Sequence, residues 1–298
     1  MKPKSGHRRF TTSMNNHRLA AIAVVLLSAS CLRPLRVARE PVKNEATLKV
    51  VTWNVNYGVG GAPDAFEQLE RATRDADLVL LQETNATWEA NVRARLTQRF
   101  PHQFWLDDAA AGGQAVLSRR AFEHEVLPPT SGWFAAIRLE SETKLGRVQV
   151  LSVHLHPPIS DSGGVVSGYL FTGQTRRHEL EDFVATLDPK LRTLIVGDFN
   201  ESTQGDAIEW AAKRGFRSAL PEFAPAANTW KWPLTKSLQL SAQFDHVLYS
   251  RGLAPLSASV LKLGRSDHFP VAVVLGESME IDLPPARGTS LGLTSAGR

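Results

Sequence analysis

Cysteine is almost absent from this sequence. Cys31 is the only one among 298 residues. No disulfide framework is therefore expected, and thiol catalysis inside the folded domain is excluded. The sequence also lacks the Gly-x-x-x-x-Gly-Lys-Ser/Thr loop, which argues against a P-loop nucleotidase. The apolar run 19–27 is too short to span a bilayer comfortably.

A strong positive charge is missing from most of the chain, although the formal net charge is +4. Residues 1–30 hold five Lys/Arg and no Asp/Glu, which leaves 29 basic and 30 acidic residues in the remainder. The basic balance therefore belongs to the N-terminal segment. A broad electrostatic footprint for nucleic acid is not indicated, although local basic contacts stay open.

The N-terminal segment 1–30 has the layout of a secretory signal peptide. Basic residues precede an apolar run, and the small residues Ser28-Ala29-Ser30 come before Cys31. The alternative is an Arg-rich tail without a targeting role. On the first interpretation the protein is exported, and is periplasmic, extracellular or lipid-anchored to the membrane.

Cys31 raises the question of a lipid anchor. A run of small residues that ends in cysteine resembles a bacterial lipobox, in which the cysteine becomes lipidated. The large aliphatic residue usual three positions earlier is replaced by Ser28, with Leu27 one step further away. A lipid anchor through Cys31 and an unmodified cysteine after the cleavage site therefore both stay open.

The remainder of the chain predicts one layered α/β domain over residues 48–276. A linker over 31–47 precedes it, and a Pro-, Gly- and Ser-rich tail over 277–298 is expected to be disordered. The apolar periodicity predicts helices over 63–73, 86–98, 174–187 and 206–214. Strands are expected over 48–55, 77–82, 103–106, 115–118, 123–127, 133–139, 147–154, 193–196, 243–249, 258–263 and 271–275. Consecutive strands without intervening helices indicate antiparallel pairing in part. The long loop 155–171 is expected to be functional or mobile.

Polar residues follow or precede the apolar strands again and again. Any one of them has an ordinary structural explanation as a cap, a turn or a satisfied core histidine. Six such positions in one context indicate a site, because a rigid sheet positions side chains at its strand ends. The positions are Asn54-Val55-Asn56, Gln82-Glu83, His154-Leu155-His156, Asp198-Phe199-Asn200, Asp245-His246 and Asp267-His268.

These residue types suit metal-assisted hydrolysis of a phosphate ester. Glu83 and Asp267 offer the hard oxygen ligands that Mg²⁺ prefers, with Asn54 as an amide ligand or an orienting group. Asp198 is suited to orient or deprotonate an attacking water. The amide of Asn200 would hold that water or a phosphate oxygen.

Two histidines complete this set of groups. His268 would donate to the phosphoryl oxygens, oriented by Asp245, and His154 offers a second donor. The His-x-His pattern at 154–156 would also allow zinc, but the surrounding carboxylates and amides suit Mg²⁺ or Mn²⁺ better.

The sequence resembles the endonuclease/exonuclease/phosphatase superfamily from about Leu48 to Leu275, with the motifs in the family's order. The resemblance rests on Thr52-Trp53-Asn54-Val55-Asn56, Leu81-Gln82-Glu83, Gly113-Gln114-Ala115-Val116-Leu117-Ser118-Arg119, Ser152-Val153-His154-Leu155, Gly197-Asp198-Phe199-Asn200, Phe244-Asp245-His246-Val247 and Ser266-Asp267-His268-Phe269-Pro270. That superfamily includes deoxyribonucleases, apurinic-site endonucleases, inositol-polyphosphate phosphatases and sphingomyelinases.

The resemblance implies an α/β (α+β) fold, a four-layered sandwich of two packed mixed sheets with helices on the outer faces. It implies metal ligation by Glu83, helped by Asn54 and Asp267. It also implies catalytic roles for His154, Asp198, Asn200, Asp245 and His268. Asn56 stands where some members carry Asp, so its share in metal binding is smaller.

The substrate is left open between nucleic acid and a phospholipid or inositol phosphate. Asn56, Arg119 and Trp230 are the candidate substrate-binding residues, with buried packing as the alternative role for Trp230. No obligate protein partner is evident. A second class of function is a binding or surface protein that keeps the fold without the chemistry. Convergence of Glu83, Asp198, Asp267 and His268 would distinguish the enzyme from that alternative.

Overall fold

The computed structural model describes residues 35–108, 110–158, 172–233, 235 and 238–278. The predicted signal peptide with Cys31, most of the loop 155–171 and nearly all of the predicted tail lie outside the described residues. Within the described part, no helix is long and apolar enough to cross a membrane.

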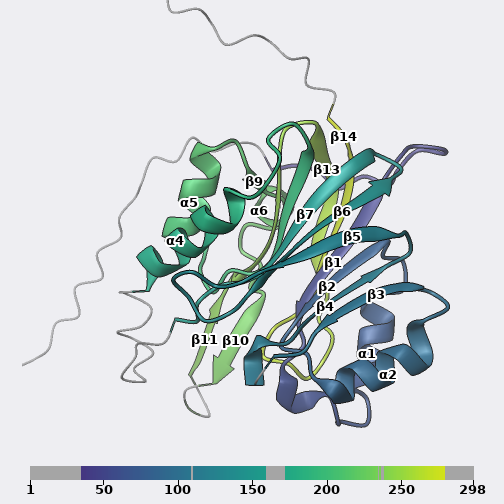
Figure 1. Cartoon of the computed structure of the whole chain (residues 1–298), viewed down its shortest axis with the longest axis vertical. Coiled ribbons are helices and arrows are strands. Elements are labelled where there is room, and N and C mark those ends of the chain that lie inside the picture. The colour runs from purple at the N-terminus through teal and green to yellow at the C-terminus, as the bar shows by residue number, and fades with distance from the viewer. Residues whose placement is uncertain (1–34, 109, 159–171, 234, 236–237, 279–298) are drawn as a thin grey trace, which may run out of the picture. The chain divides into compact units, whose positions relative to one another are not determined.

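Two six-stranded mixed sheets form the centre of the domain (Figure 1). The first has the order β13-β14-β1-β2-β4-β3, with β13 Leu253–Val260, β14 Val271–Glu277, β1 Leu48–Asn54, β2 Leu78–Gln82, β4 Gln114–Ser118 and β3 His102–Leu106. The second has the order β5-β6-β7-β8-β12-β9, with β5 Phe122–Leu127, β6 Ala136–Thr143, β7 Gly146–His154, β8 Arg192–Asp198, β12 Asp245–Tyr249 and β9 Arg217–Ser218.

The two sheets bury an aliphatic core between them. Side chains of β1, β2 and β14 meet those of β7, β8 and β12 there, among them Val50, Leu80, Val150, Val196 and Val247. All five are 0–1% exposed. The alternate residues of the central strands face outward and are apolar as well, because helices cover both outer faces.

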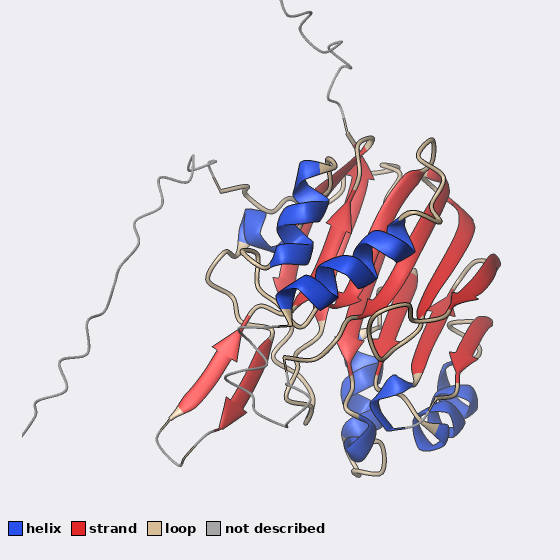
Figure 2. Ribbon diagram, turned by 60° about the vertical axis from the view of Figure 1, so that its left-hand side comes forward, coloured by secondary structure: helices blue, strands red, loops and turns tan. Residues whose placement is uncertain are grey.

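Two helices cover each outer face. Helices α1 (Ala65–Ala72) and α2 (Ala86–Leu96) pack on the first sheet. Helices α4 (Gly173–Val184) and α5 (Asp206–Lys213) pack on the second sheet, lying across its strands in Figure 2. The short elements are α6 (Leu220–Phe223) and the 3-10 turns η1 (Tyr57–Val59) and η2 (Ala110–Gly112). The predicted four-layered sandwich is therefore confirmed.

Local sequence explains the helix bounds. The apolar side chains of α1 recur at Phe66, Leu69 and Ala72, which places them on the face buried against the sheet. In α2 the N-cap residue Asn85 accepts hydrogen bonds from the backbone N–H groups of Thr87 and Trp88. Each of the four predicted helices is present, with ends shifted by a few residues.

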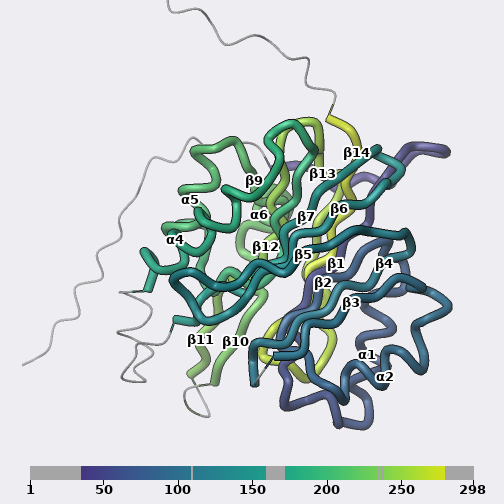
Figure 3. The backbone as a smooth tube through the Cα atoms, in the orientation of Figure 1, coloured from purple at the N-terminus to yellow at the C-terminus, as the bar shows by residue number. Residues whose placement is uncertain are grey.

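The central pair of strands in each sheet is parallel, whereas the other pairs are antiparallel. Strand β1 runs parallel to β2, and β7 runs parallel to β8. Strand β14 lies antiparallel beside β1, so the first and last strands are neighbours in one sheet (Figure 3). The carboxyl ends of β1, β2, β7 and β8 therefore lie at the same edge as the amino end of β12, where Asp245 pairs with Asp198.

Several elements differ from the sequence prediction, most clearly β6, β13 and one hairpin. Strand β6 begins at Ala136 rather than 133, because residues 131–134 form a bend. Strand β13 begins at Leu253 rather than 258. Pro255 is tolerated there because β13 is an edge strand whose register shifts after that residue. The hairpin β10 (Trp230–Pro233) and β11 (Gln239–Ala242) was not predicted, and stands apart from the large sheets in Figure 2.

The described part of the predicted linker, residues 35–47, lies against the domain. The backbone N–H of Arg36 donates to the carbonyl oxygen of Glu222 at 2.8 Å, and that of Arg39 to Leu256 at 3.0 Å. The guanidinium of Arg36 also forms an ion pair with the Glu222 carboxylate, at 2.8 Å. The folded domain therefore begins before its first strand.

Candidate active site

The polar residues predicted at strand ends meet at one edge of the sandwich. Asn54 ends β1, Glu83 follows β2, His154 ends β7 and Asp198 ends β8. Asp245 opens β12 beside Asp198, and the turn before β14 carries Asp267 and His268. Residues up to 214 positions apart in the sequence thus form one cluster.

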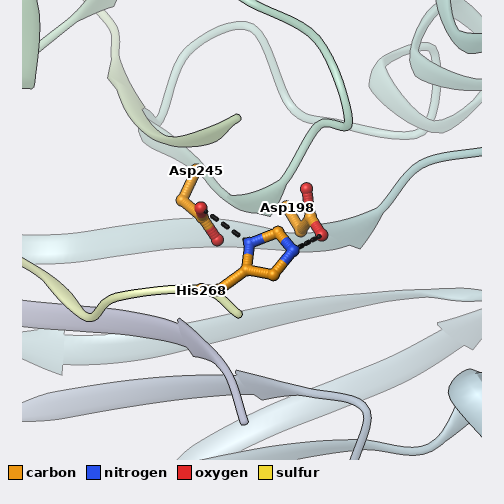
Figure 4. A group of neighbouring side chains, drawn as sticks. All are labelled: Asp198, Asp245 and His268. Carbon is orange, nitrogen blue, oxygen red and sulfur yellow. Dashed lines mark hydrogen bonds and ion pairs between the residues drawn. The ribbon is translucent and has the colours of Figure 1, made fainter. Parts of the chain in front are cut away.

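Asp245, His268 and Asp198 form a row of buried groups (Figure 4). The Nδ1 atom of His268 lies 2.9 Å from Oδ2 of Asp245. Its Nε2 atom lies 3.5 Å from Oδ2 of Asp198, so the imidazole sits between two carboxylates. The hydroxyl of Ser266 fixes this turn, because it accepts from the backbone N–H of His268 and donates to the carbonyl oxygen of Asn54.

The charges of this row favour a protonated imidazole. Burial lowers the pKa of His268, but the carboxylates of Asp245 and Asp198 outweigh that effect and raise the pKa to about 10. Burial raises the pKa of Asp198, against the opposing effect of His268. We expect the imidazolium form at neutral pH, because two acids adjoin one histidine in a site closed to solvent.

His154 is in the opposite electrostatic state. Burial lowers its pKa to about 4, against the opposing charge of Asp198. Its Nδ1 atom lies 3.2 Å from the carbonyl oxygen of Ala111, which selects the tautomer with hydrogen on Nδ1. Its ring stacks on Phe134, with centroids 4.2 Å apart. The unprotonated Nε2 atom then faces Oδ2 of Asp198 at 3.7 Å.

Asn54 acts as an orienting amide in this arrangement. Its Nδ2 group donates to Oε1 of Glu83 at 2.9 Å and to Oδ2 of Asp198 at 3.1 Å. Its oxygen accepts from the backbone N–H of Asn56 at 3.1 Å, which fixes the orientation of the amide. Of the two roles predicted for Asn54, this geometry favours orientation of the carboxylates over direct metal ligation.

Asp267 is held by two neighbouring side chains. The Nδ2 group of Asn56 donates to its Oδ1 atom at 3.1 Å, and the indole N–H of Trp230 donates to its Oδ2 atom at 3.1 Å. Asn56 and Trp230, both predicted to bind substrate, therefore position a carboxylate. Trp230 also lines the cavity described below.

Asn200 is placed beside Asp198 by two hydrogen bonds. Its backbone N–H donates to Oδ1 of Asp198 at 2.9 Å. Its Nδ2 group donates to the carbonyl oxygen of Leu155 at 2.9 Å. One N–H of the amide is thus committed to the scaffold, while the residue still lines the cavity.

Three site residues adopt a left-handed backbone conformation. The φ angles are 59° at Asn56, 56° at Glu83 and 52° at Asn200. Non-glycine residues rarely occupy this region, because Cβ approaches the backbone oxygen there. Residues in such conformations cluster at functional sites when the surrounding structure fixes them. The fixed turns here aim polar groups into the same space.

The donor set fits a divalent cation. Glu83 and Asp267 are half-buried carboxylates, and burial raises the pKa of Glu83. With Asp198 and Asp245 they place four carboxylates around one imidazolium, an excess of negative charge that a bound cation would offset. Ligand atoms of Asp198, Asp245 and His268 also lie within 4.8 Å of one another, so this group could itself hold an ion. The two ring nitrogens of His268, however, already face the carboxylates of Asp245 and Asp198.

A cavity of about 280 Å³ opens on this cluster. One part of its lining is the polar set, and the other part is aromatic and Pro-rich, comprising Trp133, Phe134, Pro157, Pro158, Trp230, Trp232 and Phe244. Trp133, Phe134 and Phe244 were not predicted as site residues from the sequence. The bend at 131–134 brings the first two to the cavity, and a Ser-Gly pair before two aromatic residues was the signal available for it.

Other conspicuous residues lie away from the site. Arg119, a predicted substrate-binding residue, donates to the carbonyl oxygens of Ala76 and Arg74. It follows Ser118, which pairs with Leu78 at the opposite end of β2 from Gln82. A larger hollow of about 690 Å³ is lined by arginines near the carboxyl ends of β12 and β14. It contains none of the predicted catalytic groups.

His246 is also outside the catalytic cluster. Its ring is buried between the hydroxyl of Ser218 and the carbonyl oxygen of Glu201, each 3.0 Å from a ring nitrogen. Burial lowers its pKa to about 4. Consecutive residues of a strand point to opposite faces of the sheet. His246 therefore points away from the site, although it follows Asp245 in the sequence, and its buried ring has a packing role.

The fold and the cluster of polar groups at the ends of two facing sheets define the class of protein to which the chain belongs. The model of the endonuclease/exonuclease/phosphatase family matches residues 51–268, and the chain belongs to that family. The predicted family is thereby confirmed. The search of curated proteins returned no match.

Solved structures show the same fold at low sequence identity. One is an endonuclease/exonuclease/phosphatase from Beutenbergia cavernae, with 19% identity over 78% of this chain and 72% of that one, and a TM-score of 0.61. Another is D. rerio TDP2 complexed with a single-strand DNA product, with 17% identity, 77% and 99% coverage, and a TM-score of 0.60. The human nocturnin catalytic domain with bound sulfate has 15% identity, 78% and 94% coverage, and a TM-score of 0.58.

Proposed function

We propose that this chain is a Mg²⁺-dependent hydrolase of phosphodiester or phosphomonoester bonds, with Mn²⁺ as an alternative ion. The observation that carries the proposal is the buried row Asp245–His268–Asp198, which meets half-buried carboxylates at the base of a cavity. A binding protein would have no need of an imidazolium held between two buried acids. Membership of a family named for endonucleases, exonucleases and phosphatases supports the same chemistry.

Asp198 is the group we assign to the attacking water. Its Oδ1 atom is held by the backbone of Asn200, and Oδ2 faces His154 across 3.7 Å. That separation is too long for a direct hydrogen bond. A water beside it would donate one hydrogen to Asp198, and the raised pKa of this carboxyl suits it to accept the proton during attack.

His268 is the group we assign to the charge that develops on the phosphoryl oxygens. Its Nδ1–H is directed to Asp245, which leaves Nε2–H on the side of Asp198 and the cavity. A pre-oriented donor of this kind stabilises the transition state without reorganisation. Glu83 and Asp267 would hold the metal ion, which when bound neutralises charge on the phosphoryl oxygens.

The test measures hydrolysis of bis-p-nitrophenyl phosphate by the purified protein with Mg²⁺ and with chelator. We expect turnover that needs the metal, and a fall of about 10²–10⁴-fold in kcat for Asp198→Asn and for His268→Ala. The matched controls are Asp75→Asn and His102→Ala, which change exposed residues at the opposite end of the first sheet.

Circular dichroism and thermal melting establish that each variant is folded. Folded Asp198→Asn and His268→Ala proteins with the activity of the controls would contradict the proposal. Equal turnover with metal and with chelator would contradict its metal requirement. A folded wild-type protein that hydrolyses no phosphate ester, including nucleic acid, sphingomyelin and inositol phosphates, would favour the binding-protein alternative.

We also propose that the protein is exported and that residues 1–30 are removed. The support is the basic, apolar and small-residue order of that segment. Mass spectrometry of the mature protein from a bacterial host should give a chain that begins at or near Cys31. Detection of intact Met1 on the functional protein would contradict export by this route. A Cys31→Ser variant separates a lipid anchor from simple cleavage.

A further inference from the structure

The aromatic part of the cavity has features that the chemistry of hydrolysis does not require. Trp133 is 48% exposed and Trp232 is 49% exposed, although both line the cavity. Exposed apolar surface that gathers beside polar residues marks a ligand-binding groove. The two residues come from separate elements, the bend before β6 and the hairpin strand β10, so two independent segments present an indole to the same space.

The remaining aromatic residues hold these indoles in place. Trp232 lies nearly parallel to Trp230, with centroids 6.5 Å apart and planes 13° apart. Trp230 in turn contacts the buried Phe244 at 4.9 Å and donates to Asp267. Trp133 lies 4.5 Å from the ring of His156. Contacts therefore link the exposed ring of Trp232, through Trp230, to the carboxylate of Asp267.

The charge of the lining residues limits the number of phosphate groups that can bind in the cavity. Its described lining contains three carboxylates and no lysine or arginine. The nearby Lys231 is held over the ring of Phe269 at 4.5 Å instead. A bound cation and one imidazolium suit one phosphate group. A polyanion would meet repulsion from the carboxylates without the basic contacts that usually bind successive phosphates.

The shape and composition of the lining favour a flat ring over a flexible chain. The described lining includes no Leu, Ile, Val or Met, the side chains expected around an alkyl chain, and apart from Ala111 its apolar residues are aromatic residues and prolines. A cavity of about 150 Å³ admits benzene. The 280 Å³ present here therefore accommodates one phosphate and one ring. Indole faces bind such rings by offset stacking.

We infer that the aromatic part of the cavity is a subsite for a planar aromatic substituent of an ester that carries a single phosphate group, with Trp133 and Trp232 as specificity-determining side chains. The inference rests on the proposed function, because it takes the position of the phosphate from that proposal. It narrows the substrate to an ester whose phosphate adjoins an aryl group or a single base-sized ring. Duplex nucleic acid and long acyl chains are disfavoured.

The test measures binding, so that it does not depend on turnover. Phenylphosphonate, cyclohexylphosphonate, hexylphosphonate and methylphosphonate are titrated into the full protein with Mg²⁺, and Kd is measured by calorimetry. These probes carry one non-hydrolysable phosphorus group. Phenyl and cyclohexyl have the same number of carbons, so their difference reports the flat face. We expect phenylphosphonate to bind about tenfold more tightly than methylphosphonate and more tightly than the other two.

Variants then locate the preference. In Trp232→Ala and in Trp133→Ala the ratio of the phenyl to the methyl Kd should approach one, whereas Trp232→Phe should retain most of the preference. Leu238→Ala removes an exposed apolar side chain near the same hairpin and should leave the ratio unchanged. Because Trp133 and Trp232 belong to different segments, misfolding of the hairpin would spare the Trp133→Ala result.

The outcomes separate this inference from the proposed function. Equal Kd values for phenyl and methylphosphonate in an active enzyme would overturn the aromatic subsite and leave the hydrolase. Tighter binding of hexylphosphonate would overturn it in favour of an alkyl-chain site. A preference for phenyl that survives both Trp→Ala changes would overturn the assignment of the two indoles. A phenyl preference in a protein without hydrolytic activity would keep the subsite and remove the proposed function.

Discussion

Burial alone does not decide the protonation state of an individual histidine in this protein. Two histidines of one cluster, His154 and His268, are equally enclosed, yet the pKa is about 4 for the first and about 10 for the second. The difference lies in their partners. His268 has carboxylates beside both ring nitrogens, whereas His154 has a carboxylate beside only one of them, a carbonyl oxygen beside the other and an aromatic ring stacked on its face. One neutral and one charged imidazole therefore face the same cavity.

His246 supports a prediction about stability at the residue scale. Its pKa is about 4 in the folded protein and about 6.5 in the unfolded chain, so the unfolded chain binds more protons between these values. Stability is therefore lost as pH falls through 6.5. Between pH 7 and pH 5 the wild type should lose about 2 kcal/mol more free energy of unfolding than His246→Gln.

Urea denaturation at the two pH values measures this difference. Glutamine keeps a donor and an acceptor at the site but does not titrate. His102→Gln is the matched control, since this histidine is exposed, and its stability should follow the wild type across the range. Parallel pH dependence of the wild type and His246→Gln would show that His246 does not titrate as proposed.

At the scale of elements, the spacing of β7 and β8 decides where Asp198 lies. Gly197 has a φ of +146°, and a Cβ atom there would come within 1.9 Å of the carbonyl oxygen of Val153 on the neighbouring strand. Only glycine permits this approach of the two strands. His154 and Asp198 form the next pair along the register, so they depend on it directly.

Gly197→Ala should therefore damage both the fold and the site. We expect a loss of about 1–3 kcal/mol in stability, from overpacking between strands. We also expect kcat to fall by more than the loss of folded protein accounts for, because Asp198 is displaced. Urea denaturation and turnover of bis-p-nitrophenyl phosphate measure the two effects. Gly61→Ala is the control, since a Cβ there meets nothing within 4 Å. If Gly197→Ala matches Gly61→Ala in both assays, the strand-spacing argument fails.

At the scale of the whole molecule, the start of the folded unit is set by contacts rather than by the first strand. Residues 35–47 bond to the domain through the backbone of Arg36 and Arg39, and Thr47 is buried. Removal of residues 1–34 should leave the Tm unchanged. Removal of residues 1–47 should cost about 1–2 kcal/mol, because two backbone hydrogen bonds and an ion pair are lost.

Thermal melting and urea denaturation of the two truncated proteins, beside the mature chain, measure these changes. An Arg36→Ala variant of the longer protein is a further control, because it removes the ion pair with Glu222 but keeps the backbone hydrogen bond. It should fall between the two truncations. Equal stability of the 35–298 and 48–298 chains would restore the interpretation of 31–47 as a simple linker.

Much of this molecule was predictable from local pattern. The four long helices and most strands follow from apolar periodicity, and the buried central strands read as continuous apolar runs. The hairpin Trp230–Ala242 was not predicted, because each of its strands is only 4 residues long and half-exposed. The start of β13 was missed because Pro255 normally argues against a strand, and only its edge position makes it acceptable.

The sequence by itself determined which chemical groups stand at the strand ends and, through their order, the family and the layered fold. Only the tertiary structure decided which contacts those groups make. Asn54 orients two acids, Trp230 holds Asp267, and Arg119 is bonded at the far end of its sheet. The physical reason is the separation along the chain between the residues that interact. Strand ends are set by neighbours along the chain, whereas these contacts join residues that only the tertiary structure brings together, and Asn54 and Asp198 are 144 positions apart.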